Sequence, residues 1–258
     1  MVLSGKRVLT VVSGASRGIG KEIAVQVSKR VAPESVFLLT ARNEATLLQI
    51  KQDILSSSEK AQVWIVVCDM GSFNDDAINT FKEVLGEIKE MGPFDSAFVF
   101  HNCGTAGDVS KRSTELSNAE QWQNYLNVNL IAMVQFNNLI LESITKEVAP
   151  HRFVVNITSL VAIQGFPSLT QVRSYGPTVH RTLLTLGGRS YTFHFDRIFE
   201  QFRIRERENA RNSAVFGEAV GVYSGEPFTT LTSTPRNRAA RTGINVVCCH
   251  YANSHYRR

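Results

Sequence analysis

The sequence lacks the features that would assign it to several specialised classes of protein. No apolar run reaches the roughly 18 residues of a membrane span. The short apolar run at the N-terminus leads into a glycine-rich turn without a small-residue cleavage site, so we expect a first strand there and no signal peptide. The four cysteines show neither metal-ligand spacing nor a disulfide framework. We therefore expect no metal site, and reduced thiols in a cytoplasmic protein.

Lysine is missing from the whole C-terminal part of the chain. All nine lysines precede residue 147, and residues 167–258 carry 13 arginines against six acidic residues. Residues 1–166, in contrast, carry 15 basic and 17 acidic residues. Such a step in composition marks a boundary. We predict one globular domain in residues 1–166, followed by an atypical, poorly ordered Arg-rich tail in 167–258 of out-of-frame or intron-derived origin.

The first part alternates between short apolar runs and segments with helical spacing. Apolar runs of strand length occupy residues 8–12, 36–39, 63–67, 97–100 and 153–157. Between them lie three apolar stripes of helical period and a longer helical segment, about 118–148, whose stripe comprises Trp122, Leu126, Leu130, Val134 and Leu141. This alternation predicts an α/β protein with a Rossmann-like, doubly wound parallel sheet.

A glycine turn directly follows the first predicted strand. Ser13-Gly-Ala-Ser-Arg-Gly-Ile-Gly20 places Gly14, Gly18 and Gly20 between a strand and a helix. Glycine permits a tight turn and lets a pyrophosphate approach the N–H groups of a helix N-terminus. We therefore predict a dinucleotide site that also includes the residues between these glycines, Ser16, Arg17 and Ile19.

The residues after the next three strands refine this cofactor prediction. Arg42 and Asn43 follow the second strand, where an NAD-binding protein would carry an acid for the ribose 2′-hydroxyl. An arginine there can bind a 2′-phosphate, so we predict NADP(H). Further cofactor contacts are expected after the third and fourth strands, from Asp69, placed to accept from the adenine amine, and from Met70, Asn102 and Gly104.

These motifs resemble those of the short-chain dehydrogenase/reductase family. Its TGxxxGxG pattern corresponds to residues 13–20, and its NNAG pattern appears in altered form as His101-Asn-Cys-Gly104. Within the family, residues 38–47, 104–111, 127–130 and 154–160 are similar to the sepiapterin reductases. The resemblance covers residues 1–166, about two thirds of the chain.

The resemblance implies an NADPH-dependent reductase that acts on a side-chain carbonyl of a pterin in tetrahydrobiopterin synthesis, as a cytoplasmic homodimer. In this family a tyrosine donates the proton, and a lysine four residues later lowers the tyrosine pKa and holds the nicotinamide ribose. A serine polarises the carbonyl, and an asparagine on the long helix supports a proton relay. Ser159 matches the serine and Asn129 the asparagine, with Thr158 as a weaker match for the serine.

The tyrosine and lysine of the family pattern are absent. Val172 lies at the tyrosine position, thirteen residues after Ser159, and Gly176 at the lysine position. Because no lysine follows Lys146, no Tyr-x-x-x-Lys motif exists in the tail. Loss of a general acid costs about 10²–10⁴ in rate. We expect weak cofactor binding, little turnover and a compromised dimer.

Other interpretations remain for the function of the chain. The first alternative is an NADP-binding protein without catalysis. The second alternative is another carbonyl reductase of the same family. The similarity of residues 107–111 to the sepiapterin reductases argues against it. The Arg-rich tail suggests a nucleic-acid or membrane surface, but it holds no nucleic-acid motif and a single basic amphipathic stretch, at 194–209, so we predict neither partner. Residues 243–252 faintly resemble the last core strand of the family.

Overall fold

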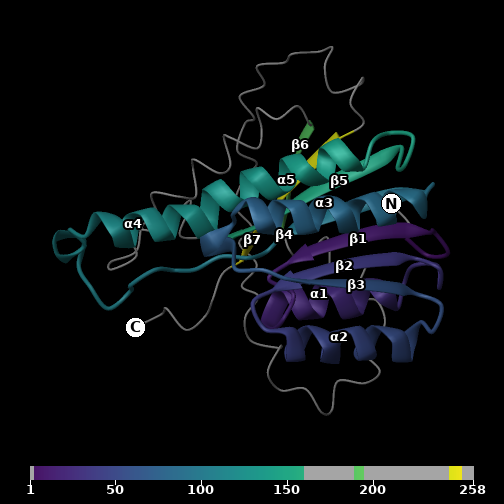
Figure 1. The fold of residues 1–258 in the computed structure, drawn as a ribbon, viewed down its shortest axis with the longest axis horizontal. Helices are drawn as coiled ribbons and strands as arrows, with labels where there is room; N and C mark the ends of the chain where they lie inside the picture. Colours follow the sequence, from purple (N-terminus) through teal and green to yellow (C-terminus); the bar gives the residue numbers. More distant parts are fainter. Residues whose placement is uncertain (1–2, 160–188, 195–243, 252–258) are drawn as a thin grey trace.

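The computed structural model describes residues 3–159, 189–194 and 244–251, and Figure 1 shows their arrangement. Strands and helices alternate through the first part of the chain, as the sequence predicts. The strands are β1 (Val8–Ser13), β2 (Val36–Ala41), β3 (Gln62–Val67), β4 (Ser96–His101), β5 (His151–Ser159), β6 (Arg189–His194) and β7 (Ile244–Tyr251). The main helices are α1 (Gly18–Ser28), α2 (Glu44–Ser57), α3 (Asp75–Glu90), α4 (Ala119–Leu126) and α5 (Ala132–Ser143).

All strand pairs in the sheet are parallel. The described strands form one seven-stranded sheet in the order β3-β2-β1-β4-β5-β7-β6. The order reverses direction at β1, with β2 and β3 on one side and β4 and β5 on the other. The predicted doubly wound, Rossmann-like fold is therefore confirmed. Ligands of such sheets bind at the carboxyl ends of the strands, next to this reversal.

Helices cover both faces of the sheet (Figure 1). On one face α1 and α2 enclose a core that includes Ile23, Ile50 and Phe37. On the other face α3 and α5 enclose a second core, in which the Phe81 and Phe136 rings lie 4.7 Å apart. β1, β2 and β4 are buried from both sides, which is why their sequences are continuous apolar runs and not alternating ones.

The longest predicted helix differs from the expectation in two respects. It consists of α4 and α5 joined by a π-helical turn, η3 (Asn127–Ile131), and it ends at Ser143 and not near residue 148. Its predicted apolar stripe is only half buried, whereas the buried face includes Tyr125, Met133 and Phe136. The stripe was spaced mostly by four residues, and such a line drifts away from the core around a helix of 3.6 residues per turn.

Most of the predicted Arg-rich tail, 167–258, lies outside the described residues. The amphipathic stretch at 194–209 also falls outside them, apart from His194 at the end of β6. The described parts of the tail are β6 and β7, and β7 pairs directly with β5. β7 coincides with the segment 243–252 that resembles the family's last strand. The boundary after residue 166 stays a prediction. No described helix has the length and hydropathy to cross a bilayer.

Candidate functional site

The glycine turn between β1 and α1 has a backbone that only glycine supplies without strain. Gly14 and Gly18 have φ angles of +66° and +54°. A Cβ on Gly14 would lie 2.9 Å from the Cys103 Cα, and one on Gly20 would overlap the carbonyl oxygen of Gly14. Gly18, in contrast, is exposed and would meet nothing within 4 Å. Two of the three glycines therefore pack the turn tightly, and Gly18 leaves its outer side open.

The N-terminus of α1 has no capping side chain. Arg17 occupies the N-cap position without a side-chain hydrogen bond, and the first turn contains no acid. In contrast, α2, α3 and α4 are each capped by an asparagine: Asn43, Asn74 and Asn118. The first N–H groups of a helix need partners and favour an anion. An uncapped helix behind an open glycine turn fits a dinucleotide pyrophosphate, with the half-buried Ser16 and Ile19 beside it.

Asn102 fastens the glycine turn to the end of β4. Its Nδ2 donates to the carbonyl oxygens of Ser13 and Gly14 at 3.2 and 3.1 Å. The N–H groups of Asn102 and Cys103 both donate to Ser13 Oγ at 3.1 Å. The Asn102 amide nitrogen is thus engaged with the turn itself. Asn102 shapes the predicted site and holds β1 and β4 in register there.

The charged residues predicted to contact the nucleotide lie at the ends of β2 and β3. Arg42 and Asp69 are both exposed, and both act electrostatically on the Cys103 thiol. Burial is the main cause that raises the pKa of Cys103, with Arg42 opposing the rise and Asp69 adding to it. The carboxyl ends of β2 and β3 therefore bring one positive and one negative side chain within electrostatic range of the same thiol, which follows β4.

Three predicted contact residues have side chains engaged elsewhere. Asn43 Oδ1 accepts from the N–H of Thr46 at 3.0 Å and so caps α2. Asp69 Oδ1 accepts from the N–H of Gly71 at 2.9 Å, which leaves its second oxygen for another donor. The Met70 side chain is buried in the core, so only its main chain can face a nucleotide.

Asn129 lies in the π-helical turn and holds the loop after β4. Its Oδ1 accepts from the N–H of Thr105 at 2.9 Å, and its Nδ2 donates to the carbonyl oxygens of Thr105 and Tyr125. A Cβ on Gly104 would lie 3.0 Å from Asn129 Oδ1. The carboxamide is buried and fully engaged, so Asn129 positions Gly104 and Thr105. Turns of this π type are frequent at functional sites.

A buried histidine between the end of β4 and α5 was not singled out by the sequence patterns. His101 ends β4, is 4% exposed, and donates from Nε2 to Asn137 Oδ1 at 3.0 Å. Its ring packs edge-on against Phe136, and its Nδ1 has no partner among the described residues. Burial lowers the His101 pKa to about 4, so the ring is neutral. The sequence signal that could have identified His101 is a histidine at the end of an otherwise apolar strand.

The predicted catalytic serine and its neighbour Thr158 end β5, two strands from the sheet reversal at β1. Ser159 is the last residue of β5 and pairs with Tyr251 of β7, while Thr158 pairs with His250. Val172 and Gly176, which stand at the family's tyrosine and lysine positions, lie outside the described residues. The backbone therefore places Ser159 at the carboxyl edge, the same edge as the glycine turn.

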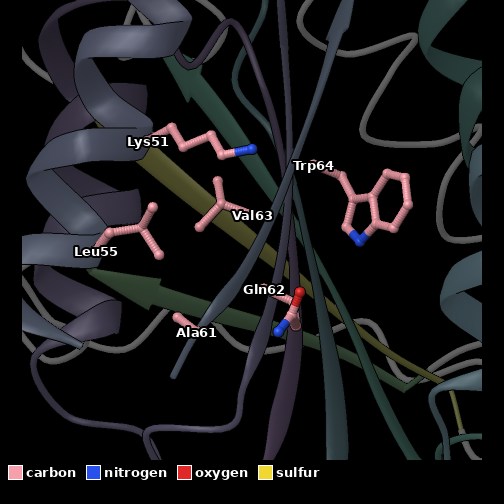
Figure 2. A pocket seen from close by; sticks show the side chains of 6 residues that line it. All are labelled: Lys51, Leu55, Ala61, Gln62, Val63 and Trp64. Carbon is pink, nitrogen blue, oxygen red and sulfur yellow. The ribbon is translucent and has the colours of Figure 1, made fainter. Parts of the chain in front are cut away.

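A shallow hollow elsewhere on the domain is separate from this site. It lies between α2 and the first half of β3, lined by Lys51, Leu55 and residues 61–64. In Figure 2 the Lys51, Leu55 and Val63 side chains lie on one side of β3 and Trp64 on the other. The residues predicted to bind a nucleotide at the carboxyl edge do not contribute to it. Among the described residues, no cluster of three or more metal-ligating side chains occurs.

Comparison with known proteins agrees with this geometry. The family model for short chain dehydrogenases matches residues 8–175. The sepiapterin reductases of Rattus norvegicus and Bos taurus are each 30% identical, over 156 and 160 residues. These matches cover 60% and 62% of this chain and 59% of each relative, so the chain matches less than two thirds of their length.

Solved structures show the same fold. A short chain dehydrogenase from Escherichia coli CFT073, crystallised in complex with NADPH, superposes with a TM-score of 0.59 at 22% identity, over 77% of this chain and 74% of that one. The glycine turn, the parallel sheet with its reversal at β1 and the match over residues 8–175 lead to one conclusion. The chain is a member of the short chain dehydrogenase family.

Proposed function

We propose that the chain binds NADP(H) at the glycine turn and reduces a carbonyl group of a small molecule, with a pterin side chain as the substrate class. The observation that carries the cofactor assignment is the uncapped N-terminus of α1 behind the open side of Gly18. NADPH supplies a hydride when it is bound. The E. coli neighbour that holds NADPH supports the same assignment by analogy.

Charge at the end of β2 supports NADP(H) over NAD(H). Arg42 is exposed beside the turn, and Arg17 is exposed within it. A guanidinium can bind a 2′-phosphate with two parallel hydrogen bonds. Arg42 has no acceptor for a ribose 2′-hydroxyl, and Asn43 Oδ1 already accepts from the N–H of Thr46 as the cap of α2.

The pterin assignment rests on similarity to the sepiapterin reductases, which this chain matches over 59% of their length. In the proposed reaction Ser159 polarises the substrate carbonyl, and Asn129 holds the loop 104–105 against which the substrate binds. By the same similarity we propose a homodimer that acts in the cytoplasm. Among the described side chains, Cys68 and Cys103 are free thiols, which suits that compartment.

A second candidate function is binding of NADP(H) without turnover. The observation that favours it is the replacement of the family's tyrosine and lysine by Val172 and Gly176. Without another proton donor, the rate would fall by about 10²–10⁴. The contacts proposed for the pyrophosphate and the adenosine come from β1 to β4 and involve neither residue, whereas the family's lysine contact to the nicotinamide ribose is lost.

One experiment separates the two functions. The purified full-length chain is titrated with NADPH and NADH by cofactor fluorescence, and sepiapterin is then added while absorbance at the NADPH maximum is followed. A reductase oxidises NADPH only when sepiapterin is present. A binding protein shows saturable NADPH fluorescence with no oxidation above the protein-free rate. Failure to bind either nucleotide would refute both functions.

A further inference from the structure

The outer side of β3 is unpaired among the residues that the structure describes. β3 is the first strand in the sheet order and pairs there with β2 alone. Two hydrogen bonds frame this pairing: the N–H of Gln62 donates to the Ser35 oxygen at 3.1 Å, and the N–H of Cys68 to the Ala41 oxygen at 3.0 Å. Main-chain groups of successive residues point to opposite sides of a strand, so the even-numbered residues face β2. The residues whose N–H and C=O groups face outward are Val63, Ile65 and Val67.

β3 lacks the features that usually protect an edge strand. Residues 62–67, Gln-Val-Trp-Ile-Val-Val, include no charge and no proline, and their register with β2 has no bulge. Edge strands of natural proteins normally carry such features, because an open row of main-chain groups can pair with another chain. At about 3.3 Å per residue, β3 offers about 20 Å of open edge. This edge is long and uncharged enough to pair with an extended segment.

The helix α2 places apolar side chains and one cation beside this edge. Leu48, Lys51 and Leu55 are spaced by three and four residues and lie on one side of α2. Lys51 and Leu55 line the hollow with the first half of β3, on the same side of the strand as Val63 (Figure 2). α2 begins after the carboxyl end of β2 and ends before β3 begins, so it runs antiparallel to β3 and places Leu48 toward Val67. These two side chains are 44% and 50% exposed.

Lys51 is the one charged residue that lines the hollow. Its ammonium group makes no ion pair with the described residues, whereas Lys21 of α1 pairs with Asp53 at 3.0 Å. No acid lies three or four residues from Lys51 along α2, where all four positions are leucine or isoleucine. A cation between Leu48 and Leu55 is complementary to a carboxylate that lies between two apolar side chains.

We propose that the outer edge of β3 binds an extended segment of a partner protein in which an acidic residue is flanked, two positions before and after it, by apolar residues. The segment adds a strand to the sheet, and its main chain pairs with the outward groups of Val63, Ile65 and Val67. Every second side chain of the segment then faces α2. This inference is independent of the proposed reductase function, because it uses none of the residues assigned to the cofactor or to catalysis.

The spacing along α2 fits this alternation. Two residues of a strand advance by about 6.6 Å. The steps from Leu48 to Lys51 and from Lys51 to Leu55 are about 4.5 and 6 Å along the helix axis. An acid opposite Lys51 therefore brings its two apolar neighbours close to the two leucines. The pattern is the same in both chain directions, so it suits a parallel and an antiparallel strand alike.

The test uses the full-length chain and two short synthetic peptides labelled with a fluorophore. One carries valine, glutamate and valine at alternate positions with threonine between them, and the other carries lysine in place of the glutamate. We expect the glutamate peptide to bind with a Kd below about 1 mM by fluorescence anisotropy, and the lysine peptide about 3- to 30-fold more weakly. Lys51→Glu should reverse this preference. Lys82→Glu, the same charge change at an exposed position of α3, is the matched control and should keep it.

Amide hydrogen exchange tests whether the peptide binds as a strand. The glutamate peptide should slow exchange of the outward N–H groups of Val63, Ile65 and Val67, and leave the inward N–H groups of Trp64 and Val66 unchanged. Ile65→Pro removes an outward N–H and no bond to β2, so it should abolish peptide binding. Ile65→Val keeps the N–H and should bind as the wild type does. If the proline variant does not fold, the exchange pattern of the wild type still decides.

Three results would overturn the proposal. The first is the absence of saturable binding of the glutamate peptide up to about 1 mM. The second is equal binding of the two peptides that Lys51→Glu leaves unchanged, or binding without slower exchange of the outward N–H groups. The third is dimerisation of the chain in sedimentation experiments that Ile65→Pro abolishes, which would assign the edge to a second copy of this chain.

Discussion

Mild acid should destabilise this domain through one residue, the buried His101. The ring is 4% exposed, and burial lowers its pKa to about 4 from the ordinary 6.5. In the folded state Nε2 donates to Asn137, and Nδ1 has no partner among the described residues. A second proton would place a charge and an unpaired N–H in the apolar layer between β4 and α5, and both are costly when buried.

The direction and size of the effect follow from proton linkage. Because the folded pKa is lower than the unfolded one, the unfolded chain binds the proton first, and stability falls as pH drops below 6.5. The loss grows by about 1.4 kcal/mol per pH unit and levels off near the folded pKa, at about 3 kcal/mol in total. Between pH 7 and pH 5 it amounts to about 2 kcal/mol.

Urea unfolding at a series of pH values measures this loss. His101→Asn cannot take up the proton, so its free energy of unfolding should change about 2 kcal/mol less than that of the wild type between pH 7 and pH 5. His151→Asn, which alters an exposed histidine, is the matched control and should follow the wild type. The pKa values of Asp53, Asp108 and Glu147 are lowered, so their contributions are lost at lower pH, outside this window. Parallel profiles for wild type and His101→Asn would refute the reasoning.

Further predictions concern the glycine turn, the proposed 2′-phosphate contact and the opposite end of the sheet. Arg42→Ala should raise the NADPH Kd about 10- to 100-fold and leave that of NADH unchanged, and equal losses for both would contradict a 2′-phosphate contact. Gly20→Ala should lower the free energy of unfolding by about 1–3 kcal/mol through its overlap with the turn, whereas Gly86→Ala, in open space on α3, should raise it by about 0.5–1 kcal/mol. Arg7 donates to three carbonyl oxygens and lies over the Phe94 ring. Arg7→Ala should therefore lower the free energy of unfolding, measured with urea, by about 2–4 kcal/mol. An unchanged free energy would show that water replaces these bonds.

The first five strands and the glycine turn could be predicted because local sequence determines them. Strands buried on both faces need continuous apolar runs, and residues 8–12 and 36–39 are examples that became β1 and β2. The turn needs glycine where φ is positive, as at Gly14 and Gly18. Each of these signals is contained in fewer than ten residues, so no tertiary information is needed to read it.

Features that depend on contacts between distant segments were not predicted. Asn129 could be matched to a motif, but its hold on Thr105 follows from the π-helical turn, which no spacing in the sequence indicates. The pair of His101 and Asn137 joins a strand to a helix 36 residues later. The register of Tyr251 with Ser159 spans more than 90 residues. Non-local pairings of this kind are fixed by the whole sheet and not by either strand.

The sheet separates the proposed cofactor contacts from the proposed catalytic serine. The turn, Arg42, Asp69 and Asn102 come from β1 to β4, which are consecutive in the chain and lie on one side of β5. Ser159 ends β5, one strand further than β4 from the reversal at β1. The hydrogen bonds that hold the glycine turn come from Ser13 and Asn102 and involve no residue of β5. We therefore expect NADPH affinity and turnover to respond to different substitutions, Arg42→Ala weakening the first and Ser159→Ala lowering the second.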